Sequence, residues 1–191
     1  RRKMSKSLGN SPDPIELIEK HSADGVRAGM LLSSPAGNDL LFDEGLCEQG
    51  RNFSNKIWNS FRLIKGWEVS QDEAPSEAAE LADKWFSAAF QKALKEINSH
   101  YDKFRMSDAL MATYRLTWDD FCSWYLEMIK PEYGKPIAKV TYDKAVSQLE
   151  NLLRVLNPFM PFITEEIWEL LTVRESENAL MVNQWPKSET L

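Results

Sequence analysis

Residues 43–66 have the sequence DEGLCEQGRNFSNKIWNSFRLIKG, in which apolar side chains recur every three or four positions. Side chains at this spacing share one face of an α-helix, so the stripe predicts an amphipathic helix that packs against a core. Glycine favours the end of a helix, which places the end near Gly66. We therefore expect a long helix whose apolar face is formed by Leu46, Phe53, Ile57, Phe61 and Ile64.

Further stripes of this kind follow toward the C-terminus, after a polar and acidic surface connection at residues 67–76. A cap at Met106-Ser107-Asp108 and a stop at Pro131 bound the middle one. A helix over residues 163–171 and an extended segment over 179–185 complete the chain. Short connections favour antiparallel packing, so we expect an all-α fold, an antiparallel helical bundle over residues 44–191 with an extended C-terminal tail. The three stripes are Phe86, Phe90, Leu94, Ile97, Tyr101 and Phe104; Leu110, Tyr114, Trp118, Phe121, Tyr125 and Met128; and Ala138, Tyr142, Ala145, Leu149, Leu152 and Leu156.

Two shorter helices are predicted on the N-terminal side of residue 43. Asp13-Pro14-Ile15-Glu16 combines a capping Asp, a Pro at the first helical position and a Glu three residues after the cap. A helix through Lys20 should follow it. A second helix is expected from about Ser22 to Leu32, because turn-forming residues begin at Ser33. Residues 11–43 are therefore expected to form a small helical linker region.

The composition favours a folded protein without a metal or nucleophilic centre. Of the 191 residues, 43% are hydrophobic, and the 27% that are charged are spread among them. No apolar run has the length of a membrane span or the form of a signal peptide, which predicts a cytoplasmic protein with no membrane partner. Cys47, Cys122, His21 and His100 are isolated in sequence, so we expect no metal site and take both histidines as surface or capping residues.

The segment Lys3-Met4-Ser5-Lys6-Ser7-Leu8-Gly9-Asn10 combines two cations with hydroxyls and a glycine. Ammonium groups on flexible stems can follow a triphosphate as negative charge grows on the leaving pyrophosphate, which makes Lys3 and Lys6 candidate catalytic residues. Ser5 and Ser7 can donate hydrogen bonds to phosphate oxygens, and Met4 is expected to anchor the loop by packing. The alternatives are a solvated basic tail, a kinase substrate site or a localisation signal.

A second face of the helix over residues 43–66 carries Arg51, Asn55, Trp58, Arg62 and Lys65 at steps of four and three. Cations for phosphates, an amide for base edges and an indole for stacking are what unstacked RNA bases require. The formal net charge of −6 means that any such RNA contact must be a local patch. On spacing alone, an equally good interpretation is that Trp58 packs in the core and the cations form a solvated face.

The order of these motifs resembles that of class I aminoacyl-tRNA synthetases over nearly the whole chain. After residues 3–10, Asp13-Pro14 and Ala23-Asp24-Gly25-Val26-Arg27 follow at the family's spacing. Residues 38–44 and 51–59 look more like the valine-specific members than the isoleucine- or leucine-specific ones. Residues 118–125 and 156–168 are similar to the family's anticodon-binding bundle, with Asn157 where the family more often carries His.

The resemblance implies roles for individual residues. Residues 1–10 would be the ATP-binding loop that ends the catalytic domain, residues 11–43 a linker that contacts the tRNA stem, and residues 44–191 the anticodon-binding bundle. ATP would be bound by Lys3, Met4, Ser5, Lys6 and Ser7, with Lys3 and Lys6 catalytic, and tRNA by Arg51, Phe53, Asn55, Lys56, Trp58 and Arg62.

The implied activity is the ATP-dependent ligation of valine to its tRNA, with Mg²⁺ accompanying ATP in the full-length enzyme. The nucleotide-binding half of the catalytic domain is expected to precede Arg1, so the chain alone should be inactive, with residues 1–9 mobile. The alternatives are a piece of an isoleucine-specific enzyme, a free-standing tRNA-binding module, and a helical interaction protein. The interaction protein differs from the others in predicting no salt-sensitive binding of tRNA.

Overall fold

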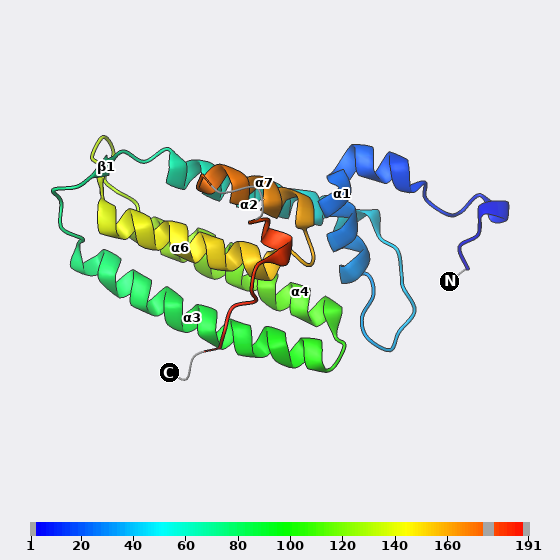
Figure 1. Cartoon of the computed structure of the whole chain (residues 1–191). Helices are drawn as coiled ribbons and strands as arrows, with labels where there is room; N and C mark the ends of the chain where they lie inside the picture. Colours follow the sequence, from blue (N-terminus) through cyan, green and yellow to red (C-terminus); the bar gives the residue numbers. More distant parts are fainter. Residues whose placement is uncertain (1–2, 174–177, 189–191) are drawn as a thin grey trace.

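Long helical rods lie side by side, with successive rods running in opposite directions (Figure 1). The computed structural model describes residues 3–173 and 178–188, and of Lys6 it describes the backbone alone. The rods are α2 (Glu44–Lys65), α3 (Glu77–Asp102), the continuous rod α4 (Met106–Arg115), η2 (Leu116–Tyr125) and α5 (Leu126–Ile129), α6 (Lys139–Leu156) and α7 (Pro161–Leu171). The prediction of an all-α antiparallel bundle is confirmed.

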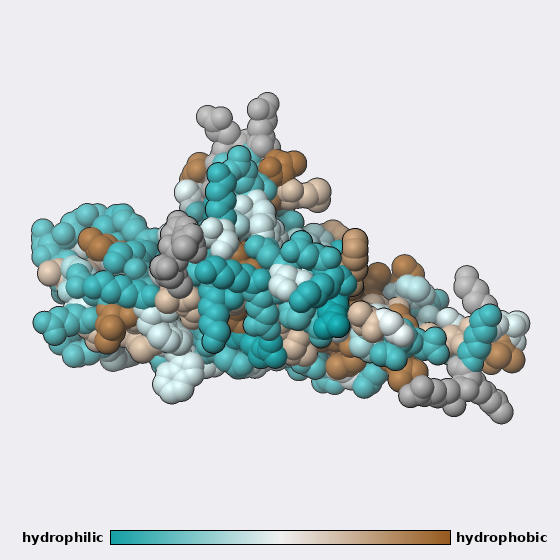
Figure 2. Space-filling model, turned by 90° about the horizontal axis from the view of Figure 1, so that it is seen from below, coloured by the Kyte–Doolittle hydropathy of each residue, from teal (hydrophilic) through white to brown (hydrophobic). Residues whose placement is uncertain are grey.

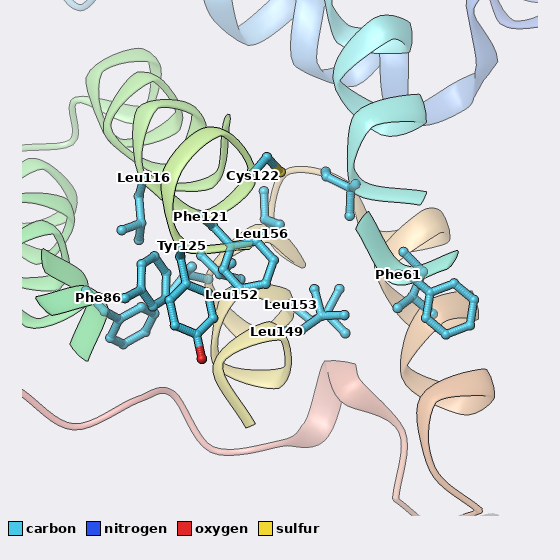
Figure 3. Packing of buried hydrophobic residues seen from close by; sticks show 14 of the residues in the cluster. Phe61, Phe86, Leu116, Phe121, Cys122, Tyr125, Leu149, Leu152, Leu153 and Leu156 are labelled. Carbon is cyan, nitrogen blue, oxygen red and sulfur yellow. The ribbon is translucent and has the colours of Figure 1, made fainter. Parts of the chain in front are cut away.

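The core of the bundle consists of the apolar stripes predicted from the sequence (Figure 3). Phe86 of α3 and Phe121 and Tyr125 of η2 are fully buried, and the ring centroids of Phe86 and Tyr125 are 4.9 Å apart. Leu149 and Leu152 of α6 complete this layer. Burying each such side chain stabilises the fold by roughly 1.5–3 kcal/mol, which makes this shared core the main reason the rods stay together.

Two elements of the rod around η2 differ from the sequence-based expectation. Met106 begins α4 with no side-chain cap hydrogen bond, so the expected cap at Met106-Ser107-Asp108 is wrong. The stretch Leu116–Tyr125 is π-helical, which a regular three-and-four spacing does not foresee. The wider turns rotate the residues that follow, and Met128, expected in the core, is 40% exposed.

The connections also contain small elements that the sequence did not indicate. The surface connection after α2 includes β1 (Val69–Ser70), which pairs in parallel with β2 (Ile137–Ala138). Phe104, assigned to the apolar stripe of α3, lies beyond the end of that helix at φ 57° and is 83% exposed. The segment over 179–185, expected to be extended, contains a 3-10 turn, η3 (Leu180–Val182), whose Leu180 is buried.

The linker region is α1 (Pro14–Leu32), two helical halves joined at Ser22, where the backbone has φ 64°. This confirms the two predicted helices. Asp13 caps the first half by accepting a hydrogen bond from the Ile15 N–H at 2.8 Å. The second half begins with the Ser22 hydroxyl accepting from the Gly25 N–H at 3.2 Å, so a side-chain cap marks each start.

The second half of α1 crosses α2 at very close range because both helices have glycine at the contact. A Cβ atom on Gly29 would lie 2.6 Å from the backbone N of Cys47, and one on Gly50 would lie 2.5 Å from the carbonyl oxygen of Gly25. Real Cβ atoms do not approach backbone this closely, so only glycine permits the crossing. His21, expected at the surface, is buried beside it, with Nε2 3.0 Å from Oε1 of Glu44.

A clasp of hydrogen bonds then fixes α1 to the corner between α6 and α7. The buried carboxylate of Asp24 accepts from the backbone N–H groups of Phe162 at 3.2 Å and Ile163 at 2.7 Å, which are in the first turn of α7. Arg27 donates to the carbonyl oxygens of Phe159 at 3.2 Å and Pro158 at 3.1 Å. A carboxylate at a helix N-terminus satisfies N–H groups that have no partner within the helix, so α1 supplies the cap that α7 lacks.

Replacing Gly29 by Ala should destabilise the protein, although alanine is the better helix former by about 1 kcal/mol. The new methyl group would collide with the backbone of α2 at Cys47, and overpacking of this kind costs about 1–3 kcal/mol. Urea unfolding of Gly29→Ala, with Glu19→Ala on the exposed face of α1 as control, measures the difference. A stabilised Gly29→Ala variant would show that α1 and α2 do not cross in this way.

Removing the Asp24 carboxylate should weaken the docking of α1. Asp24→Ala leaves the N–H groups of Phe162 and Ile163 without an acceptor and should lower the free energy of unfolding by about 1–2 kcal/mol. Asp24→Asn keeps one acceptor oxygen and should lose less. Equal stability of all three proteins in denaturant unfolding would refute the clasp.

The pH dependence of stability provides a further check on Asp24. Burial raises its pKa above the ordinary value of 3.8, and this effect exceeds the opposing effects of the two N–H groups and Arg27. A raised pKa means that the contribution of Asp24 is fully present below the unfolded value and is lost as pH rises through the folded value. The stability of wild type relative to Asp24→Asn should therefore fall as pH rises through this interval, and a rise would contradict it.

Candidate functional site

The loop over residues 3–10 folds on itself around the side chain of Asn10. Its carboxamide oxygen accepts from the Ser5 N–H at 2.8 Å, and its Nδ2 donates to the carbonyl oxygen of Lys3 at 3.2 Å. A 3-10 turn, η1 (Lys6–Leu8), and Gly9 at φ 63° lie between these bonds. Asn10 is therefore the residue that closes the loop. The sequence analysis did not assign it a role, although its place directly after Gly9 in the motif was visible.

The loop presents its polar groups to solvent, away from the bundle (Figure 1). Lys3 and Ser7 are exposed, and the hydroxyls of Ser5 and Ser7 lie 2.7 Å apart. Met4 is 39% exposed, so the structure does not show the packing expected of it. The side chain of Lys6 lies outside the described part of the chain. The expected mobility of residues 1–9 stays a prediction.

Exposed apolar side chains gather in the same N-terminal part of the molecule. Figure 2 shows brown areas around the projecting end that carries the loop. Contiguous exposed apolar surface on a folded protein usually marks a face that another chain or domain covers. The residues that form this N-terminal apolar face are Met4, Leu8, Ile15, Ile18, Leu40 and Leu41, of which Leu8 and Ile15 are about two-thirds exposed, at 65% and 64%.

The second candidate site lies on α2, where the structure separates the predicted RNA-binding residues. Arg51, Asn55 and Arg62 are exposed on the outer face. Phe53 is 1% exposed and contacts the ring of Tyr114 at 4.5 Å between centroids. Its assignment to the RNA-binding set is wrong, because a side chain buried in the core has no face on which a base can stack.

The remaining candidates lie at the two borders of the exposed α2 face. Lys56 is half-buried, with its ammonium 5.3 Å from the centroid of the Trp118 ring on η2. Trp58 is also half-buried and packs on the core beside Phe61. The core interpretation of Trp58 is therefore correct for one side of the ring, and the other side remains accessible. Arg51 donates from Nη1 to the carbonyl oxygen of Lys20 at 3.2 Å, so it also holds α1.

Two further amides, Asn52 and Asn59, are exposed on the same outer face and were missed by the sequence analysis. Their spacing from Asn55, three before and four after, was the available signal. From Arg51 to Gly66 the chain carries four cations and no carboxylate. We call this the α2 face, formed by Arg51, Asn52, Asn55, Lys56, Trp58, Asn59 and Arg62. Amides beside cations can bond base edges and phosphates together.

Metal-binding groups and membrane helices were searched for over residues 3–173 and 178–188. No group of three His, Cys, Asp or Glu side chains there lies close enough to hold a metal ion. None of the helices in these ranges is long and apolar enough to cross a membrane.

Two family models match the sequence, one on each side of α2. Residues 1–43 match the class I tRNA synthetases for isoleucine, leucine, methionine and valine, and residues 83–191 match the anticodon-binding domain of tRNA ligase. The second match covers more than half of the chain. The two matches correspond to the loop with its linker and to the bundle from within α3 onward.

Curated relatives cover α2 as well. The valine–tRNA ligase of Christiangramia forsetii is 61% identical over 186 residues, which are 97% of this chain and 21% of that protein. The enzyme of Phocaeicola vulgatus is 61% identical over 183 residues, 96% of this chain and 21% of the relative. That of Fusobacterium nucleatum is 40% identical over 195 residues, 97% and 22% of the two chains. The chain thus spans about a fifth of the length of these relatives.

A solved structure shares the fold. The LeuRS of Agrobacterium radiobacter K84, crystallised as a ternary complex with tRNA and LeuAMS, superposes with a TM-score of 0.67 at 22% identity, covering 97% of this chain and 22% of that one. At this identity the likeness concerns the fold alone. Taken with the family matches and the close relatives, it shows that the chain belongs to the class I tRNA synthetases with an anticodon-binding domain of the tRNA ligase type, within the valine–tRNA ligase family.

Proposed function

We propose that this chain supplies the tRNA-binding bundle and the ATP loop of an enzyme that joins valine to its tRNA. The observation that carries the proposal is the α2 face, a run of cations and amides without a carboxylate on a chain whose net charge is −6. The relatives at 61% identity are valine–tRNA ligases, and a LeuRS of the same fold was crystallised with tRNA. The enzyme would act in the cytoplasm, where tRNA is charged for translation.

In this proposal the loop acts on ATP only when the rest of the catalytic domain is present. The chain spans about a fifth of its relatives, and the N-terminal apolar face is the surface that the remaining catalytic residues would cover. Lys3 and Lys6 would neutralise charge on the leaving pyrophosphate, and Ser5 and Ser7 would donate to phosphate oxygens. Mg²⁺ would enter with the nucleotide. We expect the isolated chain to show no valine-dependent ATP–pyrophosphate exchange, and measurable turnover would overturn this division of the enzyme.

Asn10 would act as a positioning residue, because it bonds the backbone of the loop and not the substrate. In the full-length enzyme, Asn10→Ala should lower kcat for ATP–pyrophosphate exchange about ten-fold, the effect of losing one hydrogen bond that orders the transition state. The KM for valine should be unchanged. Asn38→Ala, at another exposed loop asparagine, is the matched control. A wild-type kcat in Asn10→Ala would remove Asn10 from the loop's function.

The α2 face would bind the anticodon stem and loop of the tRNA. Arg51 and Arg62 would contact phosphates, Asn52, Asn55 and Asn59 would bond base edges, and the accessible side of Trp58 would stack on an unpaired base. Lys56, held over Trp118, would add charge at the border of the site. The affinity of such a site depends on ionic strength, since binding releases counterions from the RNA.

Arg62→Ala should weaken binding of the cognate tRNA by the isolated chain and reduce the slope of log affinity against log salt by about 1. Lys84→Ala removes an exposed cation from α3 and should change neither quantity. Fluorescence anisotropy with labelled tRNA, titrated at several salt concentrations, measures both. Identical curves for wild type and Arg62→Ala would exclude Arg62 from the interface.

The competing assignments differ in what they predict for the same titration. A helical interaction protein without affinity for nucleic acid would bind no tRNA even at low salt. An isoleucine-specific enzyme would prefer the isoleucine tRNA over the valine tRNA. We propose preference for the valine tRNA on the strength of the relatives, because the pocket that measures the amino acid is not part of these residues.

A further inference from the structure

An apolar groove lies between α3 and the rod formed by η2 and α5. Four large apolar side chains are exposed there, namely Leu81 at 69%, Trp85 at 38%, Trp124 at 62% and Met128 at 40%. Together with Ala78 and Ala82 they line a hollow of about 690 Å³. Large apolar side chains grouped in a concave surface of a folded protein mark an interaction site more often than scattered ones do.

The groove continues along α3 past Trp85, which lines a second hollow of about 760 Å³. On α3 this second part is lined mainly by small residues, including Ala88, Ala89 and Ala93. Small side chains allow another helix to approach α3 closely. From Ala78 to Ala93 the groove is roughly 22 Å long, at 1.5 Å per residue, which is the length of a helix of about four turns.

The walls of the first hollow carry negative charge. Residues 77–85 and 116–128 contain six carboxylates and one cation, Lys84. Asp83 pairs with Lys144 at 3.2 Å, and Glu127 lies 3.5 Å from Lys130, so part of the charge is balanced within the chain. The carboxylates are Glu77, Glu80, Asp83, Asp119, Asp120 and Glu127.

This surface is separate from the α2 face. α6 contacts both α2 and α3 and lies between them (Figure 1). Figure 2, which views the molecule from the side of α3, shows brown apolar areas surrounded by teal hydrophilic surface at the end where α3 begins. The cations of α2 suit RNA phosphates, whereas the carboxylates beside Trp124 would repel them. The two faces therefore suit ligands of different chemistry.

We propose that this α3 groove binds an amphipathic helix of a partner protein, with an apolar stripe seated on Trp85, Trp124 and Met128 and Lys or Arg side chains flanking the stripe. Helix-in-groove binding uses anchors at steps of three and four residues, which match the spacing of the hollows along α3. Exposed Trp is the side chain most often found to dominate binding energy, and Met adapts to different apolar partners. The flanking cations would lie against Glu77, Glu80 and Glu127.

The test uses two synthetic helical peptides with the same leucine stripe, one flanked by Lys and the other by Glu. Calorimetry with the isolated chain should show the Lys peptide binding at least about ten-fold more tightly than the Glu peptide, because only the former complements the carboxylates. Trp124→Ala should weaken binding of the Lys peptide by at least about ten-fold. Phe162→Ala, an equally exposed apolar side chain on α7, is the matched control and should bind as wild type.

Charge reversal provides a second measurement that does not depend on the apolar contacts. The double variant Glu80→Lys and Glu127→Lys should lose its preference for the Lys peptide, since both positions are exposed and outside the core. Absence of binding, equal affinity for the two peptides, or displacement of the Lys peptide by tRNA would overturn the proposal. So would sedimentation showing that the chain self-associates through this groove and that Trp124→Ala makes it monomeric.

Discussion

The buried carboxylate of Asp24, which caps the first turn of α7 from a different helix, holds the two functional parts of the chain in one geometry. Without it, α7 would begin with unsatisfied N–H groups, and α1 would touch the bundle only through its glycine crossing with α2. The charge is costly to bury, since burial raises the pKa of this group. It is retained because the N–H groups and Arg27 need a partner at this corner. The loop with Asn10 is thus positioned relative to the α2 face by interactions made some fifteen residues away from either.

Charge is distributed unevenly over the bundle, and this distribution determines which ligand each face suits. The outer side of α2 has cations and amides, whereas the beginning of α3 and η2 have most of the nearby carboxylates. The net charge of −6 alone would argue against an RNA-binding role, but a local patch of cations is what phosphate contacts require. Segregation of this kind lets one small bundle hold an RNA on one side and leave the acidic, tryptophan-containing groove on another side for a protein.

The sequence predicted most of the helices because their boundaries depend on local signals, such as Asp43 before α2 and Gly66 after it. It failed where tertiary contacts determine the structure. The π-helical turns of η2 and the pairing of Val69 with Ile137 have no local signature, and they changed the exposure of Met128. For the site, residue type indicated the α2 face correctly, but burial removed Phe53, and no periodicity could show that Asn10 bonds across its own loop.

The rigid relation between α1 and the bundle is the central structural claim, and a distance measurement between spin labels tests it most directly. Glu19→Cys on α1 and Asn59→Cys on α2 are exposed, whereas the native Cys47 and Cys122 are buried and should remain unlabelled. Pulsed electron resonance on this pair should give a single narrow distance distribution that broadens when Asp24 is replaced by Ala. A broad distribution in the protein that retains Asp24 would contradict the account, because α1 would then move independently of the tRNA-binding face.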